Sequence, residues 1–266
     1  MLRMLAKRHL ELTGLCTRAA CRLHAVLAAL RPGGMARRLS VHNAAAMLTS
    51  MRPVSPIAQQ RKATARQHLA DIRRFDKELK ANRALIRQAV AASNTTVTDI
   101  YGVGPVAAAL LIGYTGGIGR FGSADRYAAY NGTAPVEFSS GGKKRHRLSM
   151  RRNRALNDAI HMVAVTQIRY DTEGRVYYDK KIDEANTKKE ALRVLKRRLS
   201  NVIYRHLVAD QQQTTNEGPG DTQERVSSVR GRPRIRITGS LNQSSRTRPS
   251  IWAGCRRRSP TMNPSQ

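Results

Sequence analysis

Apolar and charged positions alternate with a helical period over the first 93 residues. Between Leu5 and Leu30, apolar side chains recur at steps of three, four or seven residues, which is the spacing of one helix face. An Arg-Pro-Gly-Gly sequence at 31–34 ends this pattern. A second stripe runs from about Ile57 to Ala92, with charged residues at the other positions. The pattern predicts two helices, which form either a coiled-coil hairpin or a plain bundle.

Helical stripes return later in the chain, from Leu156 to Ile168 and from Leu192 to Ile203. Between 211 and 266, large apolar residues are few and the ten basic residues are all Arg, which is typical of disorder. We therefore predict a mainly α fold. It comprises a helical linker and possible coiled coil at 1–93, a compact helical domain at 94–210 and a disordered basic tail at 211–266.

The charge balance indicates a polyanionic partner. Lys and Arg number 48 against 18 Asp and Glu, a net charge of +30, and a field of this size favours phosphate backbones. DNA is the partner we expect. No apolar run is long enough for a membrane helix, and the start of the chain has no signal-peptide core. We expect a cytoplasmic protein with no membrane partner.

Two glycines at 102 and 104 lie in a segment with the layout of a helix-hairpin-helix. A short helix would end near Tyr101, and Pro105 would begin an Ala-rich helix. Gly102 and Gly104 permit a tight turn, and the amides that follow can hold a phosphate oxygen without reading the base sequence. The segment is interpreted either as a DNA-backbone contact or as a purely structural turn.

A serine-glycine segment followed by cations is the strongest candidate for chemistry. Ser139 and Ser140 precede two glycines on a predicted loop, and seven Lys and Arg lie between 143 and 154. A hydroxyl could attack phosphorus while the cations neutralise the charge that develops. The same segment could also be a flexible turn. The candidate DNA-binding residues are Gly102, Gly104, Lys143, Lys144, Arg145, Arg147, Arg151 and Arg154.

The chain resembles a known family in three ordered motifs. They are Gly-Val-Gly-Pro at 102–105, Ala-Pro at 134–135 with Ser-Ser-Gly-Gly-Lys at 139–143, and Asn-Arg-Ala-Leu-Asn-Asp-Ala-Ile-His at 153–161. In these motifs the segment from Asp99 to about Leu207 is similar to the C-terminal domain of Piv/MooV-type insertion-sequence transposases, the insertion sequence one-ten group. The preceding helices resemble that family's coiled-coil linker.

The resemblance implies a DNA transposase or site-specific recombinase that cleaves and rejoins strands through a serine. Ser140 would be the nucleophile, with Ser139 as the second choice. Family members join this domain to an N-terminal RuvC-like domain with four metal-binding acids, and an RNA encoded by the element guides them. We expect DNA and possibly such a guide RNA as partners, and a homo-oligomer formed through residues 1–93.

Two departures from the family change these expectations. The scattered acids of this sequence form no metal quartet, so we expect no metal site and no cofactor held by this chain. Mg²⁺ is expected only together with the missing RuvC-like domain, and the chain would be a truncated copy of uncertain activity. Arg152 also replaces the family's usual glycine. The alternative is a catalytically silent DNA- or RNA-binding remnant that interacts with intact transposases, and a third interpretation is a basic structural protein.

Overall fold

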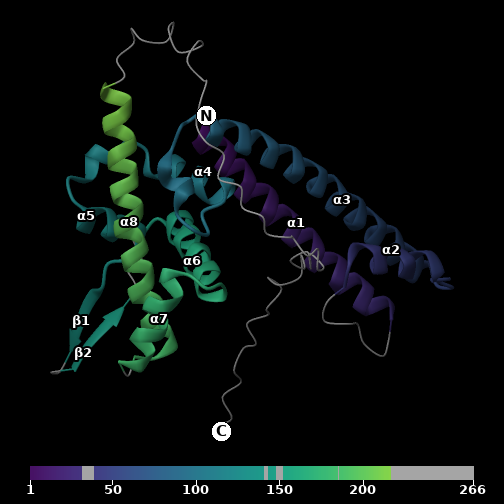
Figure 1. Cartoon of the computed structure of the whole chain (residues 1–266). Helices are drawn as coiled ribbons and strands as arrows, with labels where there is room; N and C mark the ends of the chain where they lie inside the picture. The colour runs from purple at the N-terminus through teal and green to yellow at the C-terminus, as the bar shows by residue number, and fades with distance from the viewer. Residues whose placement is uncertain (32–38, 141–142, 148–151, 185, 217–266) are drawn as a thin grey trace, which may run out of the picture. The chain divides into compact units, whose positions relative to one another are not determined.

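The protein is described by a computed structural model that covers residues 1–31, 39–140, 143–147, 152–184 and 186–216 (Figure 1). The chain is mainly α-helical, which confirms the predicted fold class. It divides into two compact units. The small unit is His9–Ala81, and the large unit combines Met1–Arg8 with the described residues from Asn82 onward.

Two long helices and one short helix build the small unit. Helix α1 (Leu2–Leu30) and helix α3 (Pro56–Ala91) match the two predicted stripes. The sequence analysis missed helix α2 (Val41–Ser50), whose first turn is capped by the Ser40 side chain accepting from the Asn43 amide. The three helices share one apolar core, so the apolar stripes of α1 and α3 are buried within the chain. Its most buried members are Leu12, Leu23, Leu27, Ala44, Ala65 and Ile72.

Short helices and one hairpin build the large unit around helix α8. The described elements are η1 (Thr96–Asp99), α4 (Pro105–Thr115), η2 (Ile118–Phe121), α5 (Ala124–Asn131), β1 (Val136–Ser140), β2 (Lys143–Arg147), α6 (Arg154–Arg169), α7 (Glu173–Asp183) and α8 (Lys188–Asn216).

The core of the large unit lies between α4, α6 and α8. Leu111 of α4, Ile160 of α6 and Ile203 of α8 are all buried in it. Tyr127 of α5 is fully buried beside them, and burial raises its pKa to about 12. Ser123 caps α5 by accepting a hydrogen bond from the Arg126 amide.

Two predicted boundaries need correction. Ser139 and Ser140 end strand β1 and do not lie on a loop, because their backbone pairs with the following strand. Helix α8 continues to Asn216, six residues into the segment predicted to be disordered, and Gln211 on it accepts a hydrogen bond from the Gly119 amide at 3.1 Å. The tail residues 217–266 lie outside the described part of the chain. Among the described helices, none combines the length and the apolar character that a bilayer crossing requires.

Candidate functional site

A two-stranded antiparallel hairpin carries both candidate serines. In the register of β1 and β2, Ser140 is opposite Lys143 and Ser139 is opposite Lys144. Cα atoms in such pairs are about 4.5–5.5 Å apart. The backbone therefore brings each serine next to a candidate DNA-binding lysine, at the turn end of the hairpin.

The other candidate cations are spread over two elements. Arg145 and Arg147 lie further along β2, and Arg154 begins α6 with an exposed side chain. Arg151 and the glycines at 141–142 lie outside the described residues. The hairpin thus gathers four of the predicted cations, and Arg154 follows where the chain leaves it.

One asparagine closes the hairpin and also begins the next helix. The Asn153 amide donates to the Tyr130 carbonyl at 2.9 Å, and its Nδ2 donates to the Tyr130 hydroxyl at 3.1 Å. Its Oδ1 accepts from the Leu156 amide at 3.2 Å, which caps α6. The chain therefore enters and leaves the hairpin at one place, and that place is fixed to α5 and α6.

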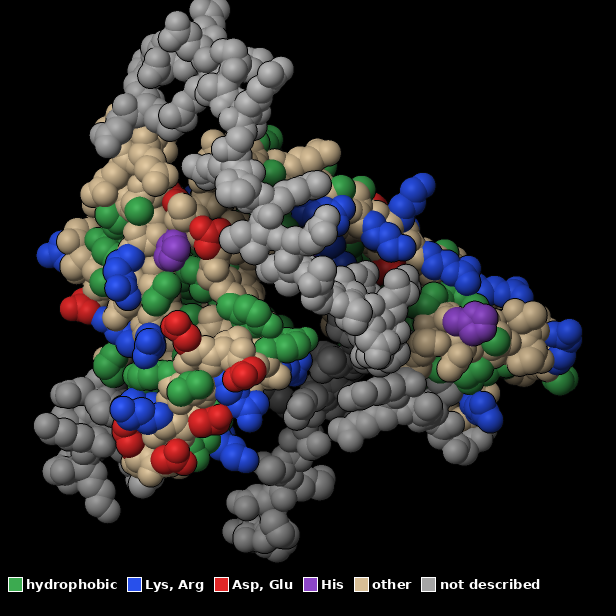
Figure 2. Space-filling view, viewed as in Figure 1, with side chains coloured by type: hydrophobic (Ala, Val, Ile, Leu, Met, Phe, Trp, Pro, Cys, Tyr) green, Lys and Arg blue, Asp and Glu red, His purple; other side chains and the backbone are tan. Residues whose placement is uncertain are grey.

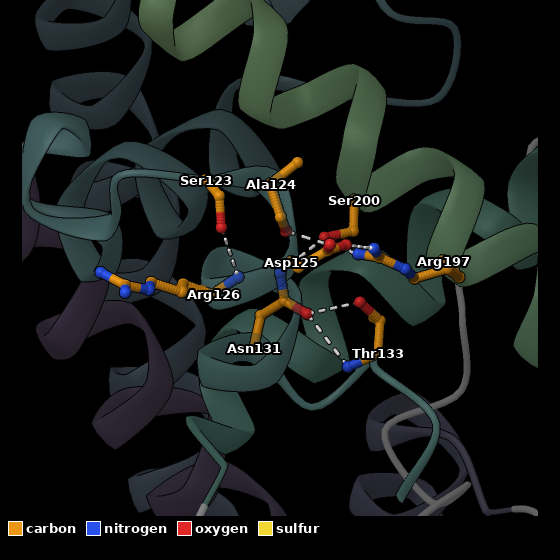
Figure 3. Close-up of polar contacts among 8 residues, drawn as sticks. All are labelled: Ser123, Ala124, Asp125, Arg126, Asn131, Thr133, Arg197 and Ser200. Carbon is orange, nitrogen blue, oxygen red and sulfur yellow. Dashed lines mark hydrogen bonds and ion pairs between the residues drawn. The ribbon is translucent and has the colours of Figure 1, made fainter.

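A second asparagine, at the end of α5, fixes the entry to the hairpin (Figure 3). The Asn131 Oδ1 accepts from the Thr133 amide at 3.1 Å and from the Thr133 hydroxyl at 2.7 Å. Its Nδ2 donates to the Ser200 hydroxyl of α8 at 2.8 Å. Asn131 and Ser200 are completely buried, so these bonds are shielded from water. They tie the segment that leads into β1 to the central helix.

An ion pair between Asp125 and Arg197 holds the beginning of α5 against the same helix (Figure 3). The Arg197 guanidinium also donates to the Ala124 carbonyl at 3.4 Å. Both ends of α5 are therefore attached to α8, so the hairpin that follows is connected to a rigid element.

A third asparagine links the hairpin to a buried lysine. The Asn157 Nδ2 donates to the carbonyls of Asn131 at 2.9 Å and Gly132 at 3.1 Å. Its Oδ1 accepts from the Lys196 ammonium at 2.8 Å. We call Asn131, Thr133, Asn153, Asn157 and Lys196 the hairpin base. Each of them bonds to a group in another element or in the chain segments that flank the hairpin.

Lys196 has an unusual electrostatic environment. Its exposed fraction is 9%, and burial lowers its pKa to about 8, with the nearby positive charge of Arg152 adding to the effect. The carboxylate of Asp158 acts in the opposite direction. A lysine with a pKa this low releases its proton far more easily than a surface lysine.

Tyr130 lies between the hairpin base and a cation. The Arg120 guanidinium lies over its ring at 4.6 Å and over the ring of Phe121 at 4.4 Å. Partial burial raises the pKa of Tyr130, but hydrogen bonds from Asn153 and Arg120 outweigh it and leave the pKa below its usual value. The phenol is thus polarised as part of a structural contact.

The glycine turn predicted to bind DNA lies against the second half of α6. Gly102 has a φ of 87°, and a Cβ there would meet Thr166 and the Val163 carbonyl at 3.3 Å. Gln167 donates to the Tyr101 carbonyl at 2.9 Å and so holds the turn in place. Gly104 precedes α4 with no atom within 4 Å of its Cβ position, so a ligand could approach its backbone closely.

The structure does not join the glycine turn and the hairpin into one site. The hairpin ends at the start of α6, whereas Gly102 contacts Thr166, twelve residues after Arg154. Twelve residues of α-helix are about 18 Å long. A nucleic acid that touched both would have to run along α6.

Sequence reasoning missed an anchor between η1 and the far end of α8. Asp210 accepts from the Thr95 hydroxyl at 2.6 Å, from the Thr96 hydroxyl at 2.7 Å and from the Thr96 amide at 3.0 Å. A ring nitrogen of His206, Nδ1, also lies 2.9 Å from the Thr96 hydroxyl. A Thr-Thr pair and an Asp more than a hundred residues later carry no signal of their contact in the sequence.

Metal ligands do not gather in the described part of the chain. Within it, no group of three or more His, Cys, Asp or Glu side chains is arranged to hold an ion. The side chains that the structure describes therefore offer no ligand set for Mg²⁺.

Comparison with known proteins shows that part of this chain is similar to transposases. Residues 94–179 match the sequence model of the IS116/IS110/IS902 transposase family. The chain is also 32% identical, over 151 residues, to the insertion element IS900 uncharacterized 42 kDa protein of Mycobacterium paratuberculosis. That alignment covers 55% of this chain and 38% of the relative, so the chain matches less than half of that protein's length. Both findings confirm the resemblance seen in the sequence motifs.

Proposed function

We propose that this chain, whose residues 94–179 match IS110-type transposases, takes part in cleaving and rejoining DNA strands, with Ser140 as the nucleophile. One observation supports this choice above others: the strand that ends in Ser140 belongs to a hairpin whose entry is held by buried hydrogen bonds and whose exit is held by the bond from the Asn153 amide to the Tyr130 carbonyl. A nucleophile on a rigid support is positioned before the substrate binds, which is what phosphoryl transfer requires.

The proposed step forms one bond and breaks one. The serine Oγ attacks a backbone phosphorus, the Oγ–P bond forms, and the P–O bond to one deoxyribose breaks. The leaving oxygen receives the proton that the serine gives up, so one strand ends in a free hydroxyl and the other is joined to the protein. Attack by a new hydroxyl on this phosphodiester reverses the step and rejoins the strands.

Cations beside the serine would stabilise the transition state. Negative charge accumulates on the phosphoryl oxygens as the serine attacks, and lysines in register with the serines lie on the same hairpin. Lys143 and Lys144 are the first candidates for this role, and Arg145 and Arg147 continue the positive charge along β2.

In this proposal, Mg²⁺ would be bound by another domain and not by the described residues of this chain. The described residues do not fit a metal site, so no step is assigned to an ion held by them. A RuvC-like domain with acidic ligands would bring the metal to the opposite side of the phosphate. This chain would then provide the serine half of a divided active site.

A denaturing-gel assay for a covalent protein–DNA adduct tests the proposal. The full chain is mixed with duplex DNA that carries the ends of its element and with Mg²⁺, in the presence and absence of a separately supplied RuvC-like domain. We expect an adduct that Ser140→Ala abolishes and that the matched variant Ser139→Ala retains.

Other outcomes of that assay would change the assignment. An adduct that is lost in Ser139→Ala and kept in Ser140→Ala would move the nucleophile by one residue. Absence of any adduct in both arrangements, with DNA binding intact, would refute cleavage and leave a DNA-binding protein.

A further inference from the structure

The outward face of helix α3 in the small unit carries a regular row of cations. Ala65, Ile72 and Leu79 are buried at intervals of seven residues. The residues that follow each of them are exposed and positively charged, and Lys77 lies exposed on the same face. We call this set the α3 basic row: Arg66, Arg73, Lys77 and Lys80.

Acidic residues on α3 are less exposed than the cations of this row, although Asp76 lies beside Arg73 and Lys80 on the helix surface. Asp71, Asp76 and Glu78 are half-buried, so they lie nearer the core than the cations do. Arg74 is ion-paired with Asp71 at 2.9 Å and is therefore not counted in the row. Figure 2 shows Lys and Arg side chains following one another along α3, with little negative charge between them.

We propose that the α3 basic row binds the phosphate backbone of a DNA duplex, as a contact surface distinct in sequence from the serine hairpin. The inference comes from the charge and burial pattern of the small unit, and it stands whether or not Ser140 is a nucleophile.

The spacing of the row suits a duplex. Arg73 and Lys80 are seven residues apart, which is about 10.5 Å along a helix. The major groove of B-DNA is about 12 Å wide, so these two side chains can reach phosphates on opposite edges of one groove. Flexible lysine and arginine side chains absorb the remaining difference. Such contacts are to phosphates alone and position a protein without reading base sequence.

Two other partners fit this surface less well. A basic amphipathic helix can bind a membrane surface, but this requires a free apolar face, and the apolar face of α3 is buried in the core of the small unit. A second copy of the small unit is also disfavoured. Its described residues contain eleven Lys and Arg against four Asp and Glu, so like charges would repel at the interface.

The test is a salt titration of binding with two variants that lose equal charge. The row variant replaces Arg66, Arg73, Lys77 and Lys80 by Gln in the full chain. The control variant replaces the exposed cations Lys188, Lys189, Arg193 and Arg205 of α8 by Gln. The probes are a 30-base-pair DNA duplex of arbitrary sequence and an RNA duplex of the same sequence, each measured by fluorescence anisotropy.

The row variant should reduce the salt dependence of binding. Each phosphate contact contributes about 0.9 to the slope of log affinity against log salt, so we expect the slope to fall by about three to four and affinity at low salt to fall at least about tenfold. The control variant should lower the slope by less than about one. A reduced slope with the DNA duplex supports the proposal, and the RNA arm shows whether the same cations also contact an RNA duplex.

Three results would overturn it. An equal reduction of the salt slope in the two variants would mean that the overall positive charge of the protein, and not the row, drives binding. An unchanged slope in the row variant with the DNA duplex would show that these cations touch no DNA phosphate. If the fourfold variant loses helical content by circular dichroism, the double variant Arg73→Gln/Lys80→Gln replaces it, and a slope reduction below about one would refute the proposal. Ser140→Ala should leave every slope unchanged, which keeps this test separate from the test of cleavage.

Discussion

Replacing Lys196 by methionine tests whether the hairpin base contains a desolvated ammonium group. Lys196 is 9% exposed and donates to Asn157 Oδ1 at 2.8 Å. Burial lowers its pKa from 10.5 to about 8 in the folded protein. The unfolded chain keeps the ordinary lysine value, so between these two pH values it binds a proton that the folded protein does not. The free energy of unfolding of the wild type should therefore increase as the pH rises through this interval.

The size of the effect follows from the pKa difference. Each pKa unit corresponds to about 1.4 kcal/mol, so the whole interval represents about 3 kcal/mol, of which about 2 kcal/mol lies between about pH 7 and pH 9.5. Methionine has a similar length and no charge, so it removes this pH dependence. It also leaves Asn157 Oδ1 without its donor, but that loss applies equally at both pH values and cancels.

Urea unfolding at the two pH values measures the effect. The difference in unfolding free energy, wild type minus Lys196→Met, should increase by about 2 kcal/mol from the lower to the higher pH. Lys189→Met, which removes an exposed lysine from the same helix, should give a difference that does not change. A difference that stays constant for Lys196→Met as well would show that the ammonium is solvated and that our account of the hairpin base is wrong.

Two further substitutions test the supports of the large unit, each by urea unfolding. Gly132→Ala should lower stability by about 2 kcal/mol, because Gly132 has a φ of 74° and a Cβ would overlap the Arg152 side chain. Gly117→Ala, where no atom lies within 4 Å, should change stability by less than about 1 kcal/mol, and equal losses would contradict the packing argument. Asp210→Ala should lower stability by about 2 kcal/mol because three donors at the start of η1 lose their acceptor. The exposed Asp99→Ala serves as its control, and an Asp210→Ala protein as stable as that control would show that the anchor contributes nothing.

Periodicity predicted the long helices because each buries one apolar face. The stripe from Leu5 to Leu30 matches α1 nearly residue for residue, and the stripe that follows matches α3. Helix α2 escaped notice because it is ten residues long and is followed closely by a proline. The core of the small unit already buries the apolar faces of these helices. Whether the helices also pair between two copies of the chain stays a prediction.

The sequence names candidate residues for chemistry, but it does not reveal the backbone structure around them. A Ser-Ser-Gly-Gly sequence is compatible with both a loop and the end of a strand. Only the backbone pairing of the two serines with Lys143 and Lys144 shows that they end a strand. The hairpin base was missed entirely. Asn131 meets its partner Ser200 at a separation of 69 residues, and an asparagine in a sequence gives no sign of which distant group it will bond.

The single hydrogen bond from the Asn153 amide to the Tyr130 carbonyl has an evolutionary consequence. Because of this bond, the chain leaves the helices after Asn131 and returns to them at Asn153 at nearly the same point. Many of the contacts that hold this point use backbone carbonyls and amides, which are present whatever side chains residues 132–152 carry. Strand sequences could therefore diverge, lengthen or be exchanged between relatives while the helices beneath remain the same. A relative's hairpin transplanted between Asn131 and Asn153 should therefore leave the helices beneath it folded.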